Sequence, residues 1–321
     1  MTPPLPSKCI SDDVLSDLVR WHSENHRVAL ITLVEIDGAT PRPLGAQMAV
    51  CENGSVTGYL SGGCIERSVA EEAMQAIAAG KNRRVRYGKG SPYFDIQLPC
   101  GSGLDLYMDQ GISAPIIAQI ADHTARRIPF VLATDLTTGS SAIENLSPHA
   151  ATGLVDGIFR RLHCPALRVL LVGGGPALIA IAQMVVAAGL ELDIVSPDAV
   201  TRTELQQMGF TARPLVNPKD ASLATLDHWT AAIVAFHEHE WEAPVLAEIM
   251  RTPCFYIGAM GSRAAHASRL ERLSHLGVAA ELQNRIRSPI GLIPGAKSRT
   301  TLAVGILAEV IAEAKAAGML A

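Results

Sequence analysis

Residues 166–198 form the segment that most constrains the fold of this chain. An apolar run from Leu167 to Val172 leads into three consecutive glycines, Gly173 to Gly175. An apolar stretch of helical length follows as far as Gly189, and a second apolar run then ends at Asp198. A strand, a glycine-rich turn, a helix and a second strand in this order are typical of the opening of a doubly wound parallel sheet.

The rest of the C-terminal half continues the same alternation. Further strands are predicted at residues 231–236 and 254–257, each followed by a polar turn and a helix. The pattern of residues 302–319 predicts a final amphipathic helix. We therefore expect residues 165–321 to form a Rossmann-like domain.

A different pattern fills residues 1–150, and the prediction here is a smaller N-terminal α/β domain of the α+β kind. Residues 139–162 are mixed in character and end in the sequence HCP, so we interpret them as the crossing between the two domains. The predicted elements are a helix at 12–21, a strand at 28–36, a turn-rich segment at 38–50, a helix from the sequence SGGC to Gly80, strands at 84–87, 104–109 and 130–135, and a helix between the last two strands.

Length and composition restrict the class of protein. A chain of 321 residues with 48% hydrophobic content is suited to two globular domains. Its 27 Lys plus Arg against 31 Asp plus Glu lack the basic excess of a nucleic-acid binder. The sequence has no apolar stretch of roughly 18 residues that predicts a membrane span, and its start, MTPPLPSKCISDD, does not resemble a signal peptide. We expect a cytoplasmic protein.

The three glycines predict a phosphate-bearing ligand. Gly173 permits a tight turn, and Gly175 allows the backbone to approach a pyrophosphate at the helix N-terminus. The sixth position of the dinucleotide fingerprint is Leu178 instead of a third glycine. Asp198 is the nearest acid that could hold a ribose, but it comes later than the usual spacing of about 20 residues. A turn that serves only the topology is the alternative, and NAD specificity is poorly supported.

His237 and His239 directly follow the strand predicted at 231–236, where doubly wound folds bind ligands. Positions two apart in extended chain face the same way, so both imidazoles can address one ligand or metal. Two histidines alone do not complete a zinc site. Ligand contact, a metal site and a solvated loop therefore remain open.

Two more turns of the C-terminal half are suited to anions. Gly261, Ser262 and Arg263 precede a predicted helix, which Ser262 can cap while Arg263 pairs with a phosphate. The alternative is simply a capped helix. Lys297 and Arg299 lie near the start of the last helix, where an anion would relieve their conflict with the helix dipole. Three such turns in one domain favour a shared ligand.

Cys64 and Cys100 differ in their surroundings from the other four cysteines. No two of the six stand at CxxC spacing, and most are expected to be reduced, buried fillers. Cys64, in SGGC, lies at or next to a helix N-terminus, which favours the thiolate. Cys100, in LPCGSG, precedes a flexible turn. Both thiols suit a sulfur or metal ligand.

These segments, taken in order, resemble the XdhC/CoxI family of accessory proteins for molybdenum hydroxylases. The most specific of them are GATPRPLGAQMAV, GYLSGGCIE, LPCGSG, the glycine turn, HEHE, YIGAMGSR and PIGL followed by AVGILAE. The resemblance implies a chaperone that binds molybdenum cofactor, protects it while a cysteine desulfurase installs the sulfido ligand, and inserts it into an apo molybdenum hydroxylase. It places Cys64 and Cys100 on the family's cysteine positions. A homodimer is expected.

The chain departs from the family pattern at two points. Pro176 stands where members often carry His, and residues 292–299 replace an Asp-Ile-Gly-Ala segment followed by Pro-Glu-Glu. Both departures look like the branch that accompanies periplasmic-type aldehyde oxidoreductases. The cofactor is thus expected to be molybdopterin or molybdopterin cytosine dinucleotide.

Two other functions compete with this prediction. An NAD(P)-dependent oxidoreductase would use the Rossmann-like domain, although Leu178 and Asp198 do not favour it. A metal-dependent hydrolase would use His237 and His239.

Overall fold

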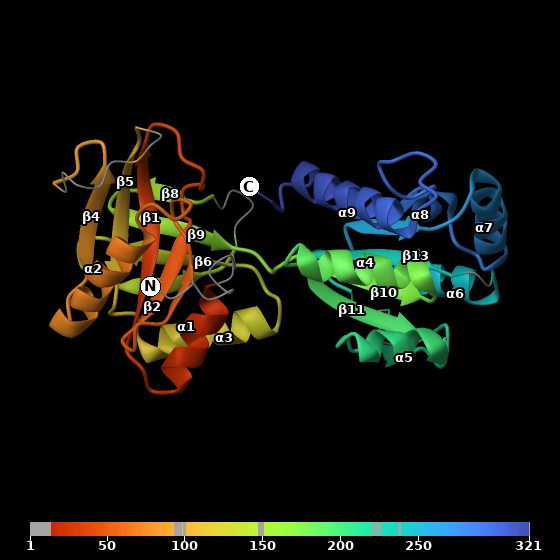
Figure 1. Cartoon of the computed structure of the whole chain (residues 1–321), viewed down its shortest axis with the longest axis horizontal. Helices are drawn as coiled ribbons and strands as arrows, with labels where there is room; N and C mark the ends of the chain where they lie inside the picture. The colour runs from red at the N-terminus through yellow and green to blue at the C-terminus, as the bar shows by residue number, and fades with distance from the viewer. Residues whose placement is uncertain are drawn as a thin grey trace. The chain divides into compact units, whose positions relative to one another are not determined.

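The computed structural model describes residues 14–92, 98, 101–146, 151–219, 223, 226–236 and 239–320, although not the side chain of His239. The chain divides into two compact units, residues 1–165 and 166–321. Figure 1 shows the helices and strands of each unit.

The first unit is built on a five-stranded antiparallel sheet with the order β3-β2-β1-β5-β4. Its central strand β1 is buried along its first seven residues, because one helix covers one face and a second sheet, together with two further helices, lies against the other. This explains why its sequence, VALITLV, is continuously apolar rather than alternating. The strands are β1 (Val28–Asp37), β2 (Gln47–Cys51), β3 (Val56–Gly58), β4 (Arg83–Gly88) and β5 (Gly103–Asp109).

A second, four-stranded antiparallel sheet completes the first unit, with the order β7-β6-β9-β8. The interpretation of residues 139–162 as an interdomain crossing was therefore wrong: they supply three of these strands. Their short length and half-exposed side chains weaken the periodic signal in the sequence. The strands are β6 (Phe130–Asp135), β7 (Ser141–Glu144), β8 (Gly153–Val155) and β9 (Ile158–His163).

The described residues of the first unit include three helices. The apolar side of α2 packs on β1, β2 and β5, while α1 and α3 pack against each other. Gly80 ends α2 in the left-handed conformation, as predicted for a glycine stop. The helices are α1 (Leu15–Ser23), α2 (Glu66–Ala79) and α3 (Ala114–Ala125).

The second unit is a six-stranded, fully parallel sheet with the order β12-β11-β10-β13-β14-β15. In order of appearance this is 3-2-1-4-5-6, the Rossmann arrangement, so the predicted doubly wound fold is confirmed. The point at which the order reverses lies between β10 and β13. The strands are β10 (Arg168–Gly173), β11 (Glu191–Ser196), β12 (Arg213–Pro214), β13 (Thr230–Ala235), β14 (Tyr256–Ala259) and β15 (Ile286–Arg287).

Helices cover both faces of this sheet, and each face has its own apolar core. One core contains α4 and α9, which run side by side in Figure 1, and the other contains α6 and α7. Within the described part of the chain, no helix is long and apolar enough to cross a membrane. The helices are α4 (Pro176–Ala187), α5 (Ala199–Gln207), α6 (His239–Ile249), α7 (Arg263–His275), α8 (Ala280–Gln283) and α9 (Arg299–Ala316).

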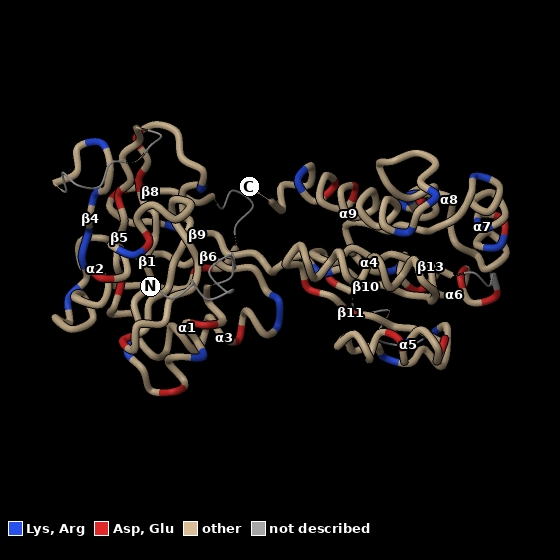
Figure 2. The backbone as a smooth tube through the Cα atoms, viewed as in Figure 1, with Lys and Arg blue, Asp and Glu red and all other residues tan. Residues whose placement is uncertain are grey.

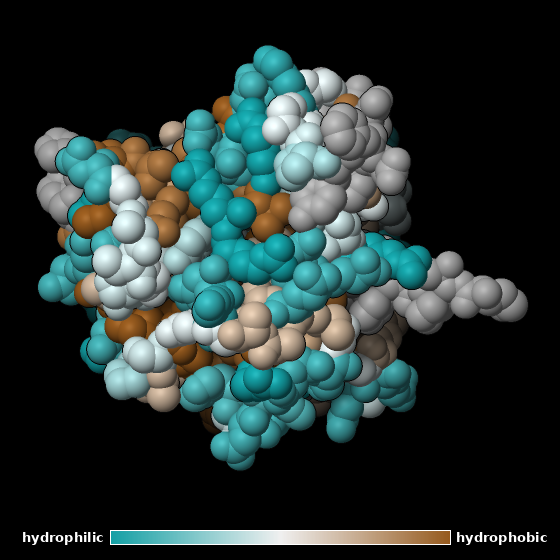
Figure 3. Space-filling model, turned by 90° about the vertical axis from the view of Figure 1, so that its left-hand side faces the viewer, coloured by the Kyte–Doolittle hydropathy of each residue, from teal (hydrophilic) through white to brown (hydrophobic). Residues whose placement is uncertain are grey.

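The basic run on β4 is neutralised within the first unit. Arg84 pairs with Glu35 at 2.7 Å, and Arg86 pairs with Asp105 at 2.5 Å. Figure 2 shows these cations along β4, and Figure 3 shows hydrophilic residues over most of this side of the unit, with smaller apolar patches between them. These arginines therefore form ion pairs with acidic residues of β1 and β5 in the same sheet.

Candidate functional site

The loop that carries Cys64 wraps around the carboxylate of Glu66, the first residue of α2. Glu66 Oε1 accepts the backbone N–H groups of Leu60 and Ser61 at 2.9 and 2.7 Å, and Oε2 accepts that of Ile65 at 3.2 Å. The Ser61 hydroxyl donates to Glu66 and accepts the N–H of Cys64 at 3.2 Å. A carboxylate at a helix N-terminus is stabilised by the free N–H groups and the helix dipole. The conformation of the loop therefore depends on one side chain.

Glu66 carries its negative charge directly beneath this loop. Burial acts to raise the pKa of the carboxyl group, but hydrogen bonds from the backbone of Ser61 and Leu60 outweigh burial and lower the pKa. Gly62 and Gly63 have φ angles of 105° and 109°, a conformation that other residues rarely adopt, so the wrapped loop requires both glycines. Sequence reasoning missed Glu66, although an acid at the first turn of a helix after a Ser-Gly-Gly turn was a visible signal.

Cys64 lines a pocket of about 150 Å³ in the first unit, and its side chain is exposed. The predicted position next to a helix N-terminus is confirmed, because Cys64 immediately precedes the N-cap residue of α2. Cys100 lies outside the described residues, but Leu98 and Ser102 on either side of it in the sequence line this pocket. The lining residues are Thr40, Pro41, Ser61, Cys64, Leu98, Ser102 and Leu104.

Three other cysteines are described, and they differ in burial: Cys51 and Cys254 are buried, whereas Cys164 is exposed. Cys254 is buried, as predicted from its apolar surroundings, and burial raises the pKa of its thiol. Cys164 was one of the cysteines expected to be a buried filler, and for this residue the expectation is wrong: it is exposed just after β9. Its neighbour in sequence, His163, takes the buried position at the end of that strand.

The glycine turn of the second unit lies at the point where the strand order reverses. Gly173 has a φ of 133°, and a Cβ there would lie 2.0 Å from the carbonyl oxygen of Ala235 at the end of β13. The next N–H, that of Gly174, donates to this same carbonyl at 3.0 Å. The turn after β10 is thus bonded directly to the end of β13, and only glycine permits such a close approach.

A hydroxyl group connects this turn to the next helix. The N–H of Gly175 donates to Thr201 Oγ1 at 2.8 Å, and the Thr201 hydroxyl donates to the Asp198 carboxylate at 2.5 Å. Asp198 also accepts the N–H groups of Val200 and Thr201, so it caps α5. These bonds lower the pKa of Asp198. Asp198, which we considered as a ribose ligand, therefore serves as a helix cap.

Among the described residues, no side chain caps α4. Gly175 is its N-cap residue and Pro176, which lacks an N–H, is its first residue. The N–H groups of Ala177 and Leu178 belong to the first turn, where helical N–H groups have no intrahelical partner. This helix end is suited to an anion. The prediction that Gly173 and Gly175 hold a phosphate remains a prediction, with α4 as its most direct donor.

The strand order makes neighbours of three loops of the second unit: the glycine turn after β10, the histidine segment after β13 and the turn after β14. Because β13 lies between β10 and β14, the loops after these strands are neighbours at the carboxyl edge of the sheet. His237 lies outside the described residues; His239 is the first residue of α6, the helix that follows β13, and its side chain is not described. Their roles as ligands therefore stay predictions, and so does the hydrolase that would use them.

The turn after β14 contains Gly261, Ser262 and Arg263. Ser262 caps α7 by accepting the N–H of Ala265 at 3.2 Å, as predicted. Arg263 is the first residue of that helix and is exposed, so its contact with a phosphate stays a prediction. A Cβ at Gly261 would lie 3.2 Å from Arg269 Nη2, which shows how closely a buried arginine approaches this turn.

The loop after β15 is held against α9. Glu309 accepts the N–H of Gly291 at 2.5 Å and the hydroxyl of Tyr256 at 3.0 Å. Ser298 caps α9, with Lys297 and Arg299 exposed on either side of it. The two cations near this helix N-terminus match the predicted arrangement, and their binding of an anion stays a prediction.

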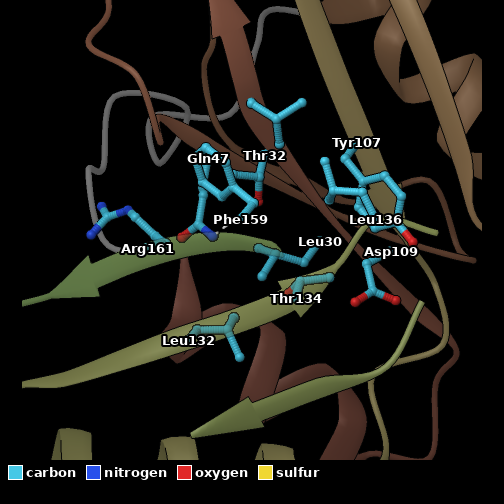
Figure 4. A pocket seen from close by; sticks show the side chains of 11 residues that line it. Leu30, Thr32, Gln47, Tyr107, Asp109, Leu132, Thr134, Leu136, Phe159 and Arg161 are labelled. Atoms are coloured by element: carbon cyan, nitrogen blue, oxygen red, sulfur yellow. Dashed lines mark hydrogen bonds between the residues drawn. The ribbon is translucent and has the colours of Figure 1, made fainter. Parts of the chain in front are cut away.

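A smaller cavity in the first unit, of about 10 Å³, has room for one water molecule at most. It lies between the two sheets, with Thr32, Gln47 and Tyr107 on one side and Leu132 and Thr134 on the other (Figure 4). Gln47 donates to Thr32 at 3.1 Å, so the polar lining is partly satisfied internally. This cavity is a packing gap and not a ligand site.

Buried acids and metal ligands do not define a second site. Burial raises the pKa of Asp109, which accepts hydrogen bonds from Gly111 and Ser141. Within the described residues, no group of three or more His, Cys, Asp or Glu side chains is placed to hold a metal ion. The structure thus offers two separate candidate sites, the Cys64 pocket in the first unit and the carboxyl edge of the parallel sheet in the second.

Two family models match the chain in both units. One, described as the XdhC Rossmann domain, matches residues 169–310. The other, described as the XdhC and CoxI family, matches residues 21–88, which include Cys64 and its loop.

Similar proteins cover nearly the whole chain. The molybdenum cofactor insertion chaperone PaoD of Escherichia coli K12 is 36% identical over 281 residues, which are 88% of this chain and 81% of PaoD. A probable xanthine dehydrogenase subunit of Bacillus subtilis 168 is 22% identical over 319 residues, covering 90% and 93% of the two chains. A crystal structure from Bacillus halodurans, described as a xanthine dehydrogenase, superposes with a TM-score of 0.71 at 18% identity and covers 94% of this chain and 96% of its own. That last likeness concerns the fold alone.

Proposed function

Because the chain belongs to the XdhC and CoxI family, we propose that it binds molybdenum cofactor and inserts it into an apo molybdenum hydroxylase of the xanthine dehydrogenase or aldehyde oxidoreductase type. It acts as an accessory protein that carries the cofactor as cargo. The similarity to PaoD, a molybdenum cofactor insertion chaperone, supports this proposal.

The observation that carries the proposal is the carboxyl edge of the parallel sheet. Here the turn after β10 places the uncapped N-terminus of α4 at the point where the strand order reverses. Rossmann-type sheets bind phosphate-bearing ligands at this point. Molybdenum cofactor carries a phosphate, or a pyrophosphate in its dinucleotide form. We assign this end of the ligand to Gly173, Gly175 and the first turn of α4, with Arg263 as a charge partner.

The pocket beside Cys64 is a second candidate site, within the first unit. Its volume of about 150 Å³ is smaller than the roughly 300 Å³ at which pockets begin to enclose a small molecule, so it takes only one end of a ligand. Thiolates are soft ligands that suit transition metals and sulfur chemistry. The proposal gives Cys64 and Cys100 the role of ligands to a molybdenum and sulfur group, with the hydroxyl of Ser102 as a polar group of the same pocket.

The finer parts of the proposal concern form and partners. The chaperone holds molybdopterin or molybdopterin cytosine dinucleotide while a cysteine desulfurase supplies the sulfido ligand, and it then meets the apo-hydroxylase. We propose that it does so in the cytoplasm and as a homodimer.

Equilibrium dialysis of the full-length protein against molybdenum cofactor tests the proposal. Bound pterin is measured by its fluorescence after oxidation, and delivery is measured as activity restored to an apo-hydroxylase. We expect binding and delivery without any oxidation of substrate by the protein itself. A folded protein that retains no pterin contradicts the proposal.

Thiol labelling gives the matched control within the same experiment. Bound cofactor should protect Cys64 from alkylation, whereas Cys164, which is exposed just after β9 but whose thiol has a pKa raised by burial, should be alkylated at the same slow rate with and without cofactor. Cys64→Ser should lower cofactor retention, and Cys164→Ser should not. Equal retention in Cys64→Ser, Cys100→Ser and the wild type would remove the thiols from the site.

An NAD(P)-dependent oxidoreductase is the second candidate, because the strand order suits a dinucleotide. The capping role of Asp198 disfavours it, since its carboxylate already accepts three hydrogen bonds from the start of α5. Titration with NADPH, followed by nicotinamide fluorescence, separates the two functions. Saturable binding of NADPH would favour the oxidoreductase.

A further inference from the structure

Arg269 is the largest fully buried side chain of the described residues, with 1% of its side chain exposed. It lies on α7 and pairs with Glu242 on α6 at 2.7 Å, and Glu242 is also buried, at 4% exposure. Taking two opposite charges out of water costs several kcal/mol per ion, and their attraction seldom returns more than this cost. An ion pair buried to this degree is therefore weak evidence of a role in stability alone.

The other contacts of Arg269 show what the pair holds. Nη2 donates to the carbonyl oxygen of Met260 at 2.5 Å, and Nη1 donates to the hydroxyl of Ser288 at 3.0 Å. Glu242, Met260 and Ser288 follow β13, β14 and β15, three adjacent strands. One guanidinium group therefore joins the segments that leave three neighbouring strands at the carboxyl edge of the sheet.

A fourth contact settles the protonation of a neighbouring histidine. Arg269 Nη1 lies 3.3 Å from His266 Nδ1. A guanidinium group can only donate hydrogen bonds, so Nδ1 must accept and the ring proton must be on Nε2. Burial, with the charge of Arg269 as a second cause, lowers the pKa of His266. His266, in the first turn of α7 after Ser262, is thus held as a neutral ring with an N–H donor on Nε2.

We propose that Arg269 is a positioning residue for the ligand site at the carboxyl edge of the parallel sheet. Paired with Glu242, it fixes the turn at Met260–Ser262, the loop at Ser288 and the tautomer of His266. The proposal rests on the proposed function in so far as this edge binds the phosphate end of the cofactor. It assigns Arg269 no contact with the ligand. Substitution of Arg269 should therefore alter the geometry of the ligand site and leave the charge of the protein surface unchanged.

The first test replaces both charges at once. In Glu242→Leu/Arg269→Met the apolar side chains have similar volumes, and such replacements of buried ion pairs commonly leave folding intact. We expect a melting temperature close to that of the wild type, but affinity for molybdenum cofactor weaker by a factor on the order of ten to a hundred, the cost of a loop misplaced by about 1 Å. Arg269→Lys keeps the charge without the planar fork, so it should retain the pair with Glu242 and still weaken binding.

Arg285 provides a matched control in the same unit. Its guanidinium group likewise joins separate segments, because it donates to the backbone carbonyl groups of Met250, Thr252 and Cys254 at 2.7, 3.1 and 2.7 Å. These groups precede β14 and so lie at the opposite, amino end of the strand. Arg285→Met should lower the melting temperature and leave cofactor affinity unchanged.

Two measurements without cofactor separate this inference from the proposed function. Nitrogen-15 NMR of the imidazole should show the Nε2–H tautomer for His266 in the wild type and its loss in Glu242→Leu/Arg269→Met. Hydrogen exchange should show faster exchange at residues 260–266 in the same variant. If these changes occur while the wild type binds no cofactor, the proposed function fails and the positioning role stands. The inference would be overturned if Glu242→Leu/Arg269→Met showed the same hydrogen exchange and the same His266 tautomer as the wild type. It would also be overturned if the wild type binds the cofactor and the double variant binds it with the same affinity.

Discussion

The N–H of Gly175 donates to the hydroxyl of Thr201 at 2.8 Å, and this bond joins the glycine turn after β10 to the helix after β11. The same hydroxyl donates to Asp198, the cap of α5. The turn is therefore oriented by a side chain 26 residues away in the sequence. The N–H groups left for a ligand belong to the first turn of α4.

Thr201→Val should destabilise the second unit. Thr201 is buried, and valine leaves the N–H of Gly175 without its partner and removes one of the three hydrogen bonds that the Asp198 carboxylate accepts. We expect a loss of about 1–3 kcal/mol in the free energy of unfolding, measured by urea titration. Thr203→Val is the matched control, because Thr203 is exposed on the same helix and bonds only within it, to Ala199. A change beyond about 0.5 kcal/mol in the control, or none in Thr201→Val, would contradict the argument.

Gly173→Ala should be among the most damaging single changes. Its Cβ would lie 2.0 Å from the carbonyl oxygen of Ala235, and both groups belong to the rigid centre of the sheet. We expect a loss of about 3 kcal/mol or more in unfolding free energy. Gly189→Ala separates the steric clash from backbone strain, since Gly189 has a φ of 74° and an added methyl group there would meet nothing within 4 Å. It should cost about 1–2 kcal/mol. Equal losses in the two variants would show that the close approach to β13 is unimportant.

Glu66→Gln should loosen the loop that presents Cys64. The amide group replaces one acceptor oxygen by a donor that faces backbone N–H groups, so hydrogen bonds worth about 1.5–3 kcal/mol to a charged acceptor are lost. Chemical denaturation measures the loss, and alkylation of Cys64 should change in rate. Glu71→Gln, on the exposed side of the same helix, removes only a surface pair with Arg67 and should cost a few tenths of a kcal/mol. If both variants behave alike, Glu66 does not organise the loop.

The pH dependence of this loop has a definite sign. The pKa of Glu66 is lower in the folded protein than its ordinary value of 4.5. The contribution of Glu66 to stability is therefore present above pH 4.5 and is lost as the pH falls through the folded pKa. Glu66→Gln should remove this part of the acid sensitivity, which unfolding curves at pH 6 and pH 4 would reveal as a smaller difference than in the wild type.

His163 should make the first unit sensitive to mild acid. Its ring is buried and stacks on Phe130 with 4.8 Å between ring centres, and its Nε2 has no hydrogen-bond partner among the described residues. Burial, followed by the charge of Arg161, lowers the pKa well below the ordinary 6.5. Because the unfolded chain takes up the proton more readily, full stability is present above pH 6.5 and falls at lower pH, by at most about 1.4 kcal/mol per pH unit from this group.

His163→Leu isolates that effect. At pH 8 the ring is neutral in both states, so a difference between the variant and the wild type reports packing alone. Between pH 6.5 and pH 5 the variant should lose less stability than the wild type, as followed by thermal unfolding. Parallel pH profiles for the two proteins would show that His163 is not the sensitive group.

Much of the local structure was predictable because its determinants are local. The apolar runs at β1, β10 and β13 and the glycine stop at Gly80 lie where periodicity and turn residues place them. The caps at Ser262 and Ser298 involve residues only three positions away, so they too belong to short-range chemistry. The strands at 141–163 were missed because their half-exposed residues show no clear alternation.

The candidate site was only partly predictable. The sequence pointed to Cys64, Gly173, Gly175 and Ser262, and the strand order makes the three loops of the second unit neighbours. It did not point to Thr201 or Arg269. Thr201 contacts Gly175, 26 residues away in the sequence, and Arg269 contacts Glu242, 27 residues away. A local sequence pattern does not reveal contacts over such separations.

The sequence by itself determined the class of fold, the family and the turns that are suited to anions, because these depend on hydrophobic period, glycine positions and ordered motifs. Only the tertiary structure decided what those turns do. It assigned Asp198 to a helix cap instead of a ribose, placed the Glu66 carboxylate beneath the cysteine loop, and buried Arg269 among three strand ends. The physical reason is that a polar group must find a partner when it is buried, and that partner is chosen by the packing of the whole unit rather than by its neighbours along the chain.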